Sequence, residues 1–191
     1  MGVREPVSRR GGPVRPALSR AAIVEAALAV ADRQGLDAVS MRRVAEELDT
    51  GASALYVYIR NRDDLLEAMF DHAMAPVAAA ELPAGDWRER LTGLLLEAIA
   101  AARGHGGLAR VALTTVPDGP NAVAVTGRVR ELLAEGGLPA ATVPAALDLL
   151  ALFVTGAALD RVPAGAPEQH RERLRWEIDV IVSGLIAVAG R

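Results

Sequence analysis

Apolar residues recur along this chain with the spacing of α-helices. In the first such segment, Ile23, Ala27 and Val30 stand at positions i, i+4 and i+7 and therefore share one helical face. Ser19 precedes the segment as a candidate N-cap, and Gly35 follows it as a stop signal. The sequence lacks a series of alternating β-branched runs bounded by turns, which would indicate strands. We therefore expect an all-α fold.

Two short helices are predicted next. Ser40 can cap a helix that turns Val44 inward and ends near Leu48. The Asp-Thr-Gly sequence at 49–51 is a tight break, and residues 52–59 then carry a third helical pattern. Two short helices joined by three residues are typical of a helix-turn-helix.

Longer helical segments fill the remainder of the chain. Their expected ranges are 64–76, 86–103, 108–115, 121–135, 141–160 and 167–189, with a Pro-Ala-Gly loop at 163–165 before the last. The last two segments carry more apolar surface than the core of a monomer of this size needs. We therefore expect them to form a helical interface between two copies of the chain.

Charge is divided unevenly along the sequence. The net charge of the whole chain is −3. Residues 1–62 hold ten Arg and seven acidic residues, whereas residues 63–191 hold eleven Arg and seventeen acidic residues. A basic front suits contact with DNA at one end only. Residues 1–17 predict a flexible basic arm, and no secretory signal is expected there. The absence of cysteine excludes disulfides and thiolate metal sites, and a cytoplasmic location is expected.

Residues 138–159 are apolar enough to raise the possibility of a membrane helix. Pro144 and Asp148 interrupt this stretch, and no positively charged flank precedes it. A helix buried in protein is the better interpretation, so no membrane partner is expected.

Two clusters carry a resemblance to a known family. They are Ser-Met-Arg-Arg-Val-Ala at 40–45 and Leu-Tyr-Val-Tyr-Ile-Arg-Asn-Arg-Asp-Asp-Leu-Leu at 55–66. Together they resemble the tetracycline-repressor (TetR) family of bacterial transcription regulators. The resemblance implies an Ω-shaped, all-helical homodimer, with a helix-turn-helix DNA-binding domain at 18–62 and an effector-binding and dimerisation domain at 63–191. It also implies that the last two helices of one subunit pack against the same two helices of its partner and form a four-helix bundle.

The resemblance assigns the DNA contacts by position. The residues expected to face double-stranded DNA are Ser40, Arg42, Ala52, Ser53, Ala54, Tyr56, Val57, Tyr58, Arg60 and Arg62. Ser40, Tyr56, Arg60 and Arg62 are expected at phosphates, and Arg42 either at phosphate or at a guanine. Where the family usually has Gly and an apolar residue, this chain has Asp49 and Thr50. Asp tolerates left-handed backbone, so the turn can survive, whereas the packing beneath Thr50 is expected to depart from the family's pattern.

The family's effector pocket maps onto a mostly apolar set. The residues expected to bind a small molecule are Leu94, Ala98, His105, Ala112, Thr115, Arg128 and Phe153. Ala112 stands where the tetracycline repressor has a metal-coordinating His, so a magnesium-tetracycline effector is not expected. No metal ligand and no cofactor are assigned, and the sequence leaves open whether effector binding needs a metal. The effector should be largely apolar. Arg128 is equally well explained as an exposed helix residue.

Two other function classes, an enzyme and a helical module that does not bind DNA, fit the sequence less well. The three His residues lie far apart in the sequence, and no metalloprotease or phosphate-loop motif occurs, so an enzyme is not expected. A helical ligand-binding or dimerisation module without DNA binding is the alternative. The basic residues of the first 62 positions argue against that alternative. The sequence leaves activation or repression open.

Overall fold

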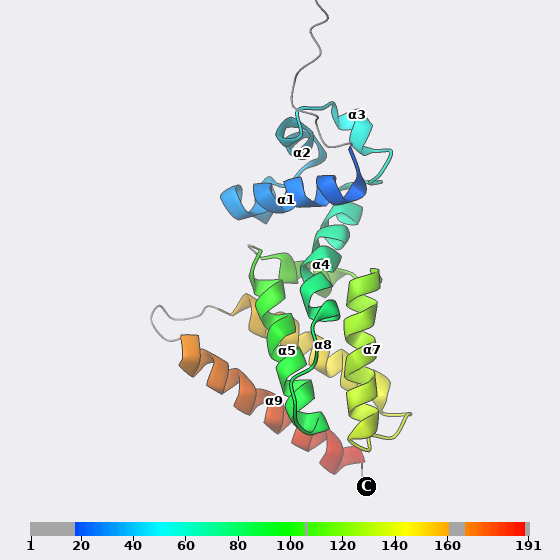
Figure 1. The fold of residues 1–191 in the computed structure, drawn as a ribbon, viewed down its shortest axis with the longest axis vertical. Coiled ribbons are helices and arrows are strands. Elements are labelled where there is room, and N and C mark those ends of the chain that lie inside the picture. The colour runs from blue at the N-terminus through cyan, green and yellow to red at the C-terminus, as the bar shows by residue number, and fades with distance from the viewer. Residues whose placement is uncertain (1–17, 106, 161–166, 190–191) are drawn as a thin grey trace, which may run out of the picture.

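The computed structural model describes residues 18–105, 107–160 and 167–189. In this part of the chain it contains nine α-helices, two 3-10 helices and no strand, which confirms the expected all-α fold (Figure 1). The α-helices are α1 Arg20–Gln34, α2 Met41–Glu47, α3 Ala52–Leu55, α4 Arg62–Ala79, α5 Trp87–Arg103, α6 Val111–Thr114, α7 Pro120–Glu135, α8 Val143–Leu159 and α9 Pro167–Ala189; the 3-10 helices are η1 Leu36–Ala38 and η2 Leu108–Arg110. The expected basic arm and the loop at 163–165 lie outside the described residues.

Side-chain caps fix the starts of four helices. Ser19 Oγ accepts a hydrogen bond from the backbone of Ala22, and Ser40 Oγ accepts one from the backbone of Arg43. Asn61 caps α4 in the same way, and Asp86 opens α5 with a full capping box. Each such cap is worth about 1 kcal/mol. The Ser19, Ser40 and Asp86 caps, and the cap signal at Asn61, are confirmed.

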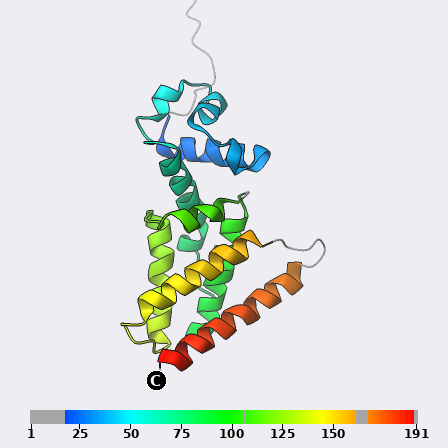
Figure 2. The ribbon, with the colours of Figure 1, turned by 180° about the vertical axis from the view of Figure 1, so that it is seen from behind.

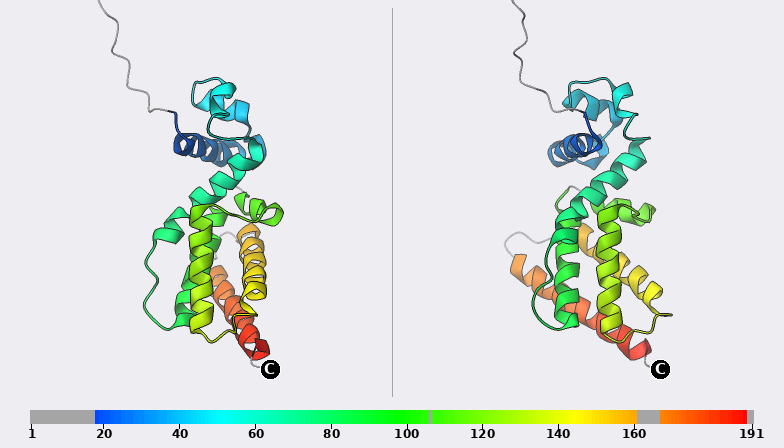
Figure 3. Two further views of the ribbon diagram at one scale, coloured as in Figure 1. Left: turned by 90° about the vertical axis from the view of Figure 1, so that its right-hand side faces the viewer. Right: turned by 45° about the vertical axis from the view of Figure 1, so that its right-hand side comes forward.

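Helices α1, α2 and α3 gather at one end of the molecule, which we call the head. Their shared core contains Ile23, Val30, Val44, Leu55 and Ile59, all without exposed surface. Helix α4 begins in the head and runs into the larger helical body (Figures 1 and 3). The expected domain boundary at 62/63 therefore falls in the first turn of a continuous helix.

The third helix is shorter than predicted. We expected one helix over 52–59, but α3 ends at Leu55, and the next three residues form turns closed by bonds from the Tyr58 and Ile59 amides to the Leu55 carbonyl. Aromatic and β-branched residues such as Tyr56 and Val57 are weak helix formers. The expected buried pair, Leu55 and Ile59, still faces the core.

The body packs α5 and α7 beside the lower half of α4, and α8 and α9 run across one face of the body, where both contact α5 (Figure 2). Leu91, Ile99, Leu133, Leu150 and Ile178 form its fully buried centre. No helix in the described ranges is long and apolar enough to cross a membrane.

Large apolar side chains remain exposed on α8 and α9. They are Leu149, Leu152, Leu159, Trp176, Val180 and Val188. Exposed apolar surface concentrated on two neighbouring helices is typical of an interface with another protein chain. This distribution agrees with the expected intermolecular packing of the last two helices.

Candidate functional site

The tip of the head presents a short run of exposed side chains. Tyr56 is 55% exposed and Val57 is 78% exposed, although the residues on either side of the run, Leu55 and Ile59, are fully buried. Tyr58 lies between these extremes. The two buried anchors therefore fix the backbone while three large side chains point outward.

The turn before α3 adopts the expected conformation. Asp49 has a φ of 49°, in the left-handed region that Asp tolerates better than most residues. Thr50 is exposed, and its amide donates to the Ala45 carbonyl at 2.9 Å. The departure at Thr50 leaves no packing defect, because its side chain does not lie in the core.

Ser40 and Arg42 stand at the start of α2. Ser40 Oγ accepts the capping bond at 3.2 Å and can still donate its own proton. Arg42 is 88% exposed at its side chain, and its Nε lies 3.4 Å from Glu46 Oε1. An exposed pair of this kind is weak, so the guanidinium of Arg42 is available to a partner of opposite charge.

The remaining expected base-facing residues also lie at the surface. Ser53 is exposed, and Ala52 and Ala54 are half-buried on α3. Alanine offers only methyl contacts, so few hydrogen-bonding groups stand along this helix.

Arg60 and Arg62 behave differently from each other. Arg60 has an 81% exposed side chain, with Nε 3.4 Å from Asp64 Oδ2. Arg62 instead turns back into the head: its Nε donates to the Val39 carbonyl at 2.8 Å, and its Nη2 donates to the Leu36 carbonyl at 3.2 Å. Arg62 thus supports the loop before α2, whereas we had expected it to hold phosphate.

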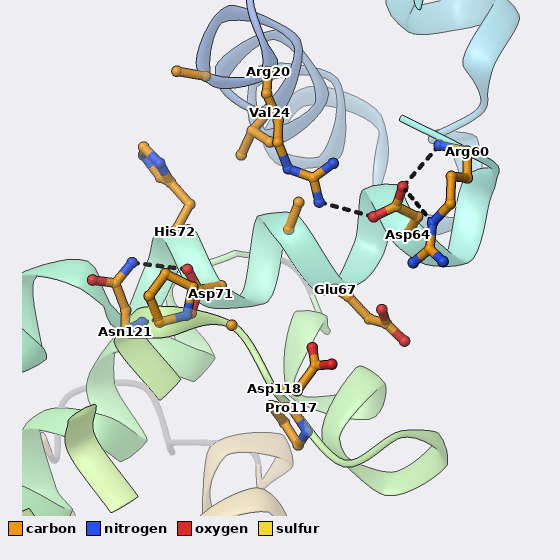
Figure 4. A pocket seen from close by; sticks show the side chains of 14 residues that line it. Arg20, Val24, Arg60, Asp64, Glu67, Asp71, His72, Pro117, Asp118 and Asn121 are labelled. Carbon is orange, nitrogen blue, oxygen red and sulfur yellow. Dashed lines mark hydrogen bonds and ion pairs between the residues drawn. The ribbon is translucent and has the colours of Figure 1, made fainter. Parts of the chain in front are cut away.

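Asp64 joins three parts of the head and is a residue that sequence reasoning missed. Its Oδ1 lies 2.8 Å from Arg20 Nη2, and its Oδ2 accepts from the Arg60 amide at 2.7 Å (Figure 4). Burial alone raises the pKa of Asp64, but the hydrogen bonds and charge of Arg20 and the bonds from Arg60 outweigh it and lower this pKa. The sequence signal was only an acidic residue in a first helical turn.

An apolar cavity of about 360 Å³ lies in the body between α4, α5, α7 and α8. Phe70, Leu95, Val129 and Leu150 are among its apolar walls, and Thr126, Arg130, Asp148 and Thr155 supply its polar groups. Its size falls within the usual range for small-molecule pockets. Two of the expected effector residues, Ala98 and Ala112, line it.

The other five expected effector residues are not among the residues that line this cavity. Leu94 is buried in the core, Phe153 is half-buried against that core, and Thr115 donates its hydroxyl to the Val111 carbonyl. His105 Nδ1 lies 3.1 Å from Asp32 Oδ1 on α1, and Arg128 donates to backbone carbonyls at the end of α4. Position in the sequence alone could not reveal these partners.

A second cavity, of about 420 Å³, lies where the head meets the body (Figure 4). Its lining includes the charged and polar residues Arg20, Glu67, Asp71, Asp118 and Asn121. Among the described residues, no group of three or more His, Asp or Glu side chains could hold a metal ion.

Comparison with known proteins covers both parts of the chain. Residues 23–69 match the family described as "Bacterial regulatory proteins, tetR family", and residues 79–184 match "Tetracyclin repressor-like, C-terminal domain". The HTH-type transcriptional repressor DrrR1 of Streptomyces coeruleorubidus is 36% identical over 77% of this chain and 54% of its own length. An HTH-type transcriptional regulator of Saccharopolyspora erythraea is 31% identical over 74% of this chain and 60% of its own length.

A solved structure extends the likeness to the fold. Streptomyces coelicolor ActR, crystallised in complex with actinorhodin, is 32% identical and superimposes with a TM-score of 0.79, over 92% of this chain and 98% of ActR. The chain thus covers nearly all of ActR but only 54–60% of the two curated relatives.

Proposed function

The chain belongs to the TetR family of bacterial regulatory proteins, and from this premise we propose that it is a ligand-responsive transcriptional regulator that binds double-stranded DNA as a homodimer. The observation that carries the proposal is the exposed run Tyr56–Tyr58, held between the buried anchors Leu55 and Ile59 and facing outward at the tip of the head. Three exposed large side chains on a rigid support are suited to entering a groove of DNA.

Contacts with DNA divide into positioning and reading. The hydroxyls of Ser40 and Tyr56 and the guanidinium of Arg60 suit phosphates, which fix the register of the head. Arg42 can reach a guanine edge, and the methyl groups of Ala52 and Ala54 suit thymine. With so few hydrogen-bonding groups, sequence selection should depend strongly on DNA shape.

We propose the apolar cavity of the body as the effector site. Ala98 and Ala112 contribute small apolar side chains to its wall, and Arg130 and Asp148 are its charged lining residues. A largely apolar small molecule with a few polar groups matches this lining. No group of three or more metal-ligating side chains was found among the described residues that line it.

An effector can regulate DNA binding only if it binds one conformation of the protein more tightly than another. We propose that the chain represses transcription and that the effector prefers a body conformation in which the two heads no longer fit the DNA together. The exposed apolar faces of α8 and α9 would join the two subunits. The operator should then be a near-palindrome with half-sites about 34 Å apart, or a multiple of that distance. A cytoplasmic location and the lack of a catalytic role complete the proposal.

A mobility shift tests this function directly. Duplex DNA from the region flanking the protein's own gene should be retarded at low salt, and the shift should weaken as salt rises. Actinorhodin, the molecule crystallised with ActR, is a reasonable first compound to test for release. Absence of any shift at low salt would favour the alternative, a ligand-binding module that does not contact DNA.

A further inference from the structure

Helix α7 begins without a cap of its own. Its N-cap residue is Gly119, which has no side chain to accept the first amide hydrogens. The missing acceptor comes from another helix: Asp71 of α4 accepts from the Asn121 amide at 2.9 Å and from the Ala122 amide at 3.0 Å. Its other oxygen accepts from Asn121 Nδ2 at 2.8 Å (Figure 4). Asp71 therefore supplies, from α4, the side-chain acceptor that Gly119 lacks.

Glycine at position 119 allows this close approach. A Cβ placed on Gly119 would lie 2.3 Å from both Cγ and Oδ1 of Asp71, which is far inside van der Waals contact. The loop before α7 thus fits directly against the carboxylate.

At the C-terminal end of α4, a residue of α7 in turn supplies the cap. Helix α4 has no basic residue in its last turn and ends at Ala79. Arg128 of α7 compensates: its Nη1 donates to the Val77 carbonyl at 2.7 Å and to the Ala78 carbonyl at 3.2 Å, and its Nη2 donates to the Ala80 carbonyl at 2.7 Å. A cation at the carbonyl end of a helix satisfies unpaired acceptors and complements the helix dipole.

Each helix therefore caps the other, and the two caps resist sliding. Asp71 meets the start of α7, and Arg128, two turns further along α7, meets the end of α4. An axial shift of α7 by one residue, about 1.5 Å, would strain bonds at both ends together. The two caps therefore tie the axial position of α7 to that of α4.

The positions of α4 and α7 connect the two candidate sites. Ala122, Val125 and Val129 of α7 line the apolar cavity. The first turn of α4 carries Asp64, which holds α1 through Arg20. Helix α4 therefore connects α7, which lines the cavity, to the head.

We propose that Asp71 and Arg128 are positioning residues that couple the effector cavity to the DNA-reading head. This inference rests on the proposed function. Neither side chain needs to touch effector or DNA. Their role is to convert movement of α7 into movement of α4.

Because coupling between two sites is reciprocal, DNA can serve as the probe in place of an effector. Hydrogen exchange of the full-length protein is measured with and without saturating duplex DNA from the region flanking its gene. In the wild type, DNA should slow exchange over residues 123–135 of α7 by about fivefold or more, the low end of typical coupling between linked sites. Asp71→Ala and Arg128→Met should each reduce this slowing of exchange to half of the wild-type value or less, at DNA concentrations that saturate each variant.

Matched variants separate coupling from general damage. Asp71→Asn retains one acceptor oxygen for the two amides and should restore most of the response. Asp118→Ala removes a similar charge from an exposed position just before α7 and should leave the response intact. If Asp71→Ala fails to fold, Arg128→Met and Asp71→Asn still test the assignment.

The possible failures are distinguishable. DNA that binds the wild type without altering α7 exchange would overturn the inference alone, as would a full response in both Asp71→Ala and Arg128→Met. A wild-type protein that does not bind DNA would overturn the proposed function, and the inference with it.

Discussion

Arg20 Nη2 lies 2.8 Å from Asp64 Oδ1, and this ion pair joins the first turn of α1 to the first turn of α4. The Asp64 side chain is only 8% exposed. Arg20 also donates from Nη1 to the Tyr58 carbonyl at 2.8 Å, so the same guanidinium holds the turn that follows α3. One buried carboxylate and one arginine therefore connect α4 to the surface proposed to read DNA.

Asp64→Asn should destabilise the head. The substitution removes the negative charge and replaces one carboxylate oxygen by an amide N–H₂ group. This group faces the donors of either Arg20 or Arg60, and the hydrogen bonds on that side are lost. We expect the free energy of unfolding to fall by about 1.5–3 kcal/mol, the range for hydrogen bonds to charged groups. Chemical denaturation would measure the change. Asp63→Asn, at the exposed neighbouring position, is the control, and equal losses in both variants would contradict the assigned role of Asp64.

The same carboxylate makes stability depend on pH. Arg20 and Arg60 lower the pKa of Asp64 in the folded protein despite its burial, so the stabilisation is present above the unfolded pKa of about 3.9. It is lost as pH falls through the lower, folded value. The difference in unfolding free energy between the wild type and Asp64→Asn should hold steady from pH 7 to about 5 and shrink below about 4. A difference that grew on acidification would have the wrong sign.

Local features of the fold were predictable from the sequence because their causes are local. Ser19, Ser40 and Asp86 lie immediately before the helices that they cap, and a helical apolar period needs only a short window to be seen. The left-handed backbone at Asp49 was likewise expected from residue type. These signals sufficed for the helix order and for the helix-turn-helix, whereas the residues of the candidate reading surface came from the family resemblance.

Long-range partners were beyond the same reasoning. Arg128 looked equally suited to an effector pocket or to solvent, but its acceptors lie about fifty residues earlier in the sequence, at the end of α4. Arg62 looked like a phosphate ligand, but it donates to carbonyls at positions 36 and 39. A guanidinium can serve any of these acceptors, so only the packed fold decides between them.

Arg42→Ala and Tyr56→Phe should each weaken DNA binding without unfolding the protein. Both side chains are exposed, so neither change removes core packing. If Arg42 binds a phosphate, its substitution should reduce the salt dependence of binding by about one counterion. If Arg42 binds a guanine, the substitution should cost about 1–3 kcal/mol of binding free energy and relax specificity. Mobility shifts over a salt series distinguish these outcomes.

Arg33→Ala is the matched charge control for Arg42→Ala. Arg33 lies at the far end of α1, where it pairs with Glu47 and is half-exposed. Its removal should have a clearly smaller effect on affinity. Equal effects of the two substitutions would show that net charge, and not the position of Arg42, governs binding.

Ala112→Phe should weaken effector binding while preserving DNA binding. Ala112 is half-buried on the wall of the 360 Å³ cavity, and a phenyl ring there would occupy space proposed for the ligand. A loss of about tenfold in affinity, equivalent to ~1.4 kcal/mol, is expected for any compound that binds the cavity. Titration calorimetry with a compound that releases DNA would measure it. Ala134→Phe, on the exposed side of α7, should leave that affinity unchanged.

Leu152→Arg should separate the two subunits. Leu152 on α8 is 64% exposed and Trp176 on α9 is 67% exposed, so neither supports the core of its own subunit. In a dimer joined by these helices, a buried unpaired guanidinium at position 152 would be strongly unfavourable. Light scattering should then give the mass of a monomer, and affinity for a two-half-site operator should fall because both heads no longer bind together. Leu113→Arg on α6 introduces the same side chain at another exposed leucine and should leave the dimer intact. A dimer that persisted in Leu152→Arg would place the subunit interface away from this face of α8.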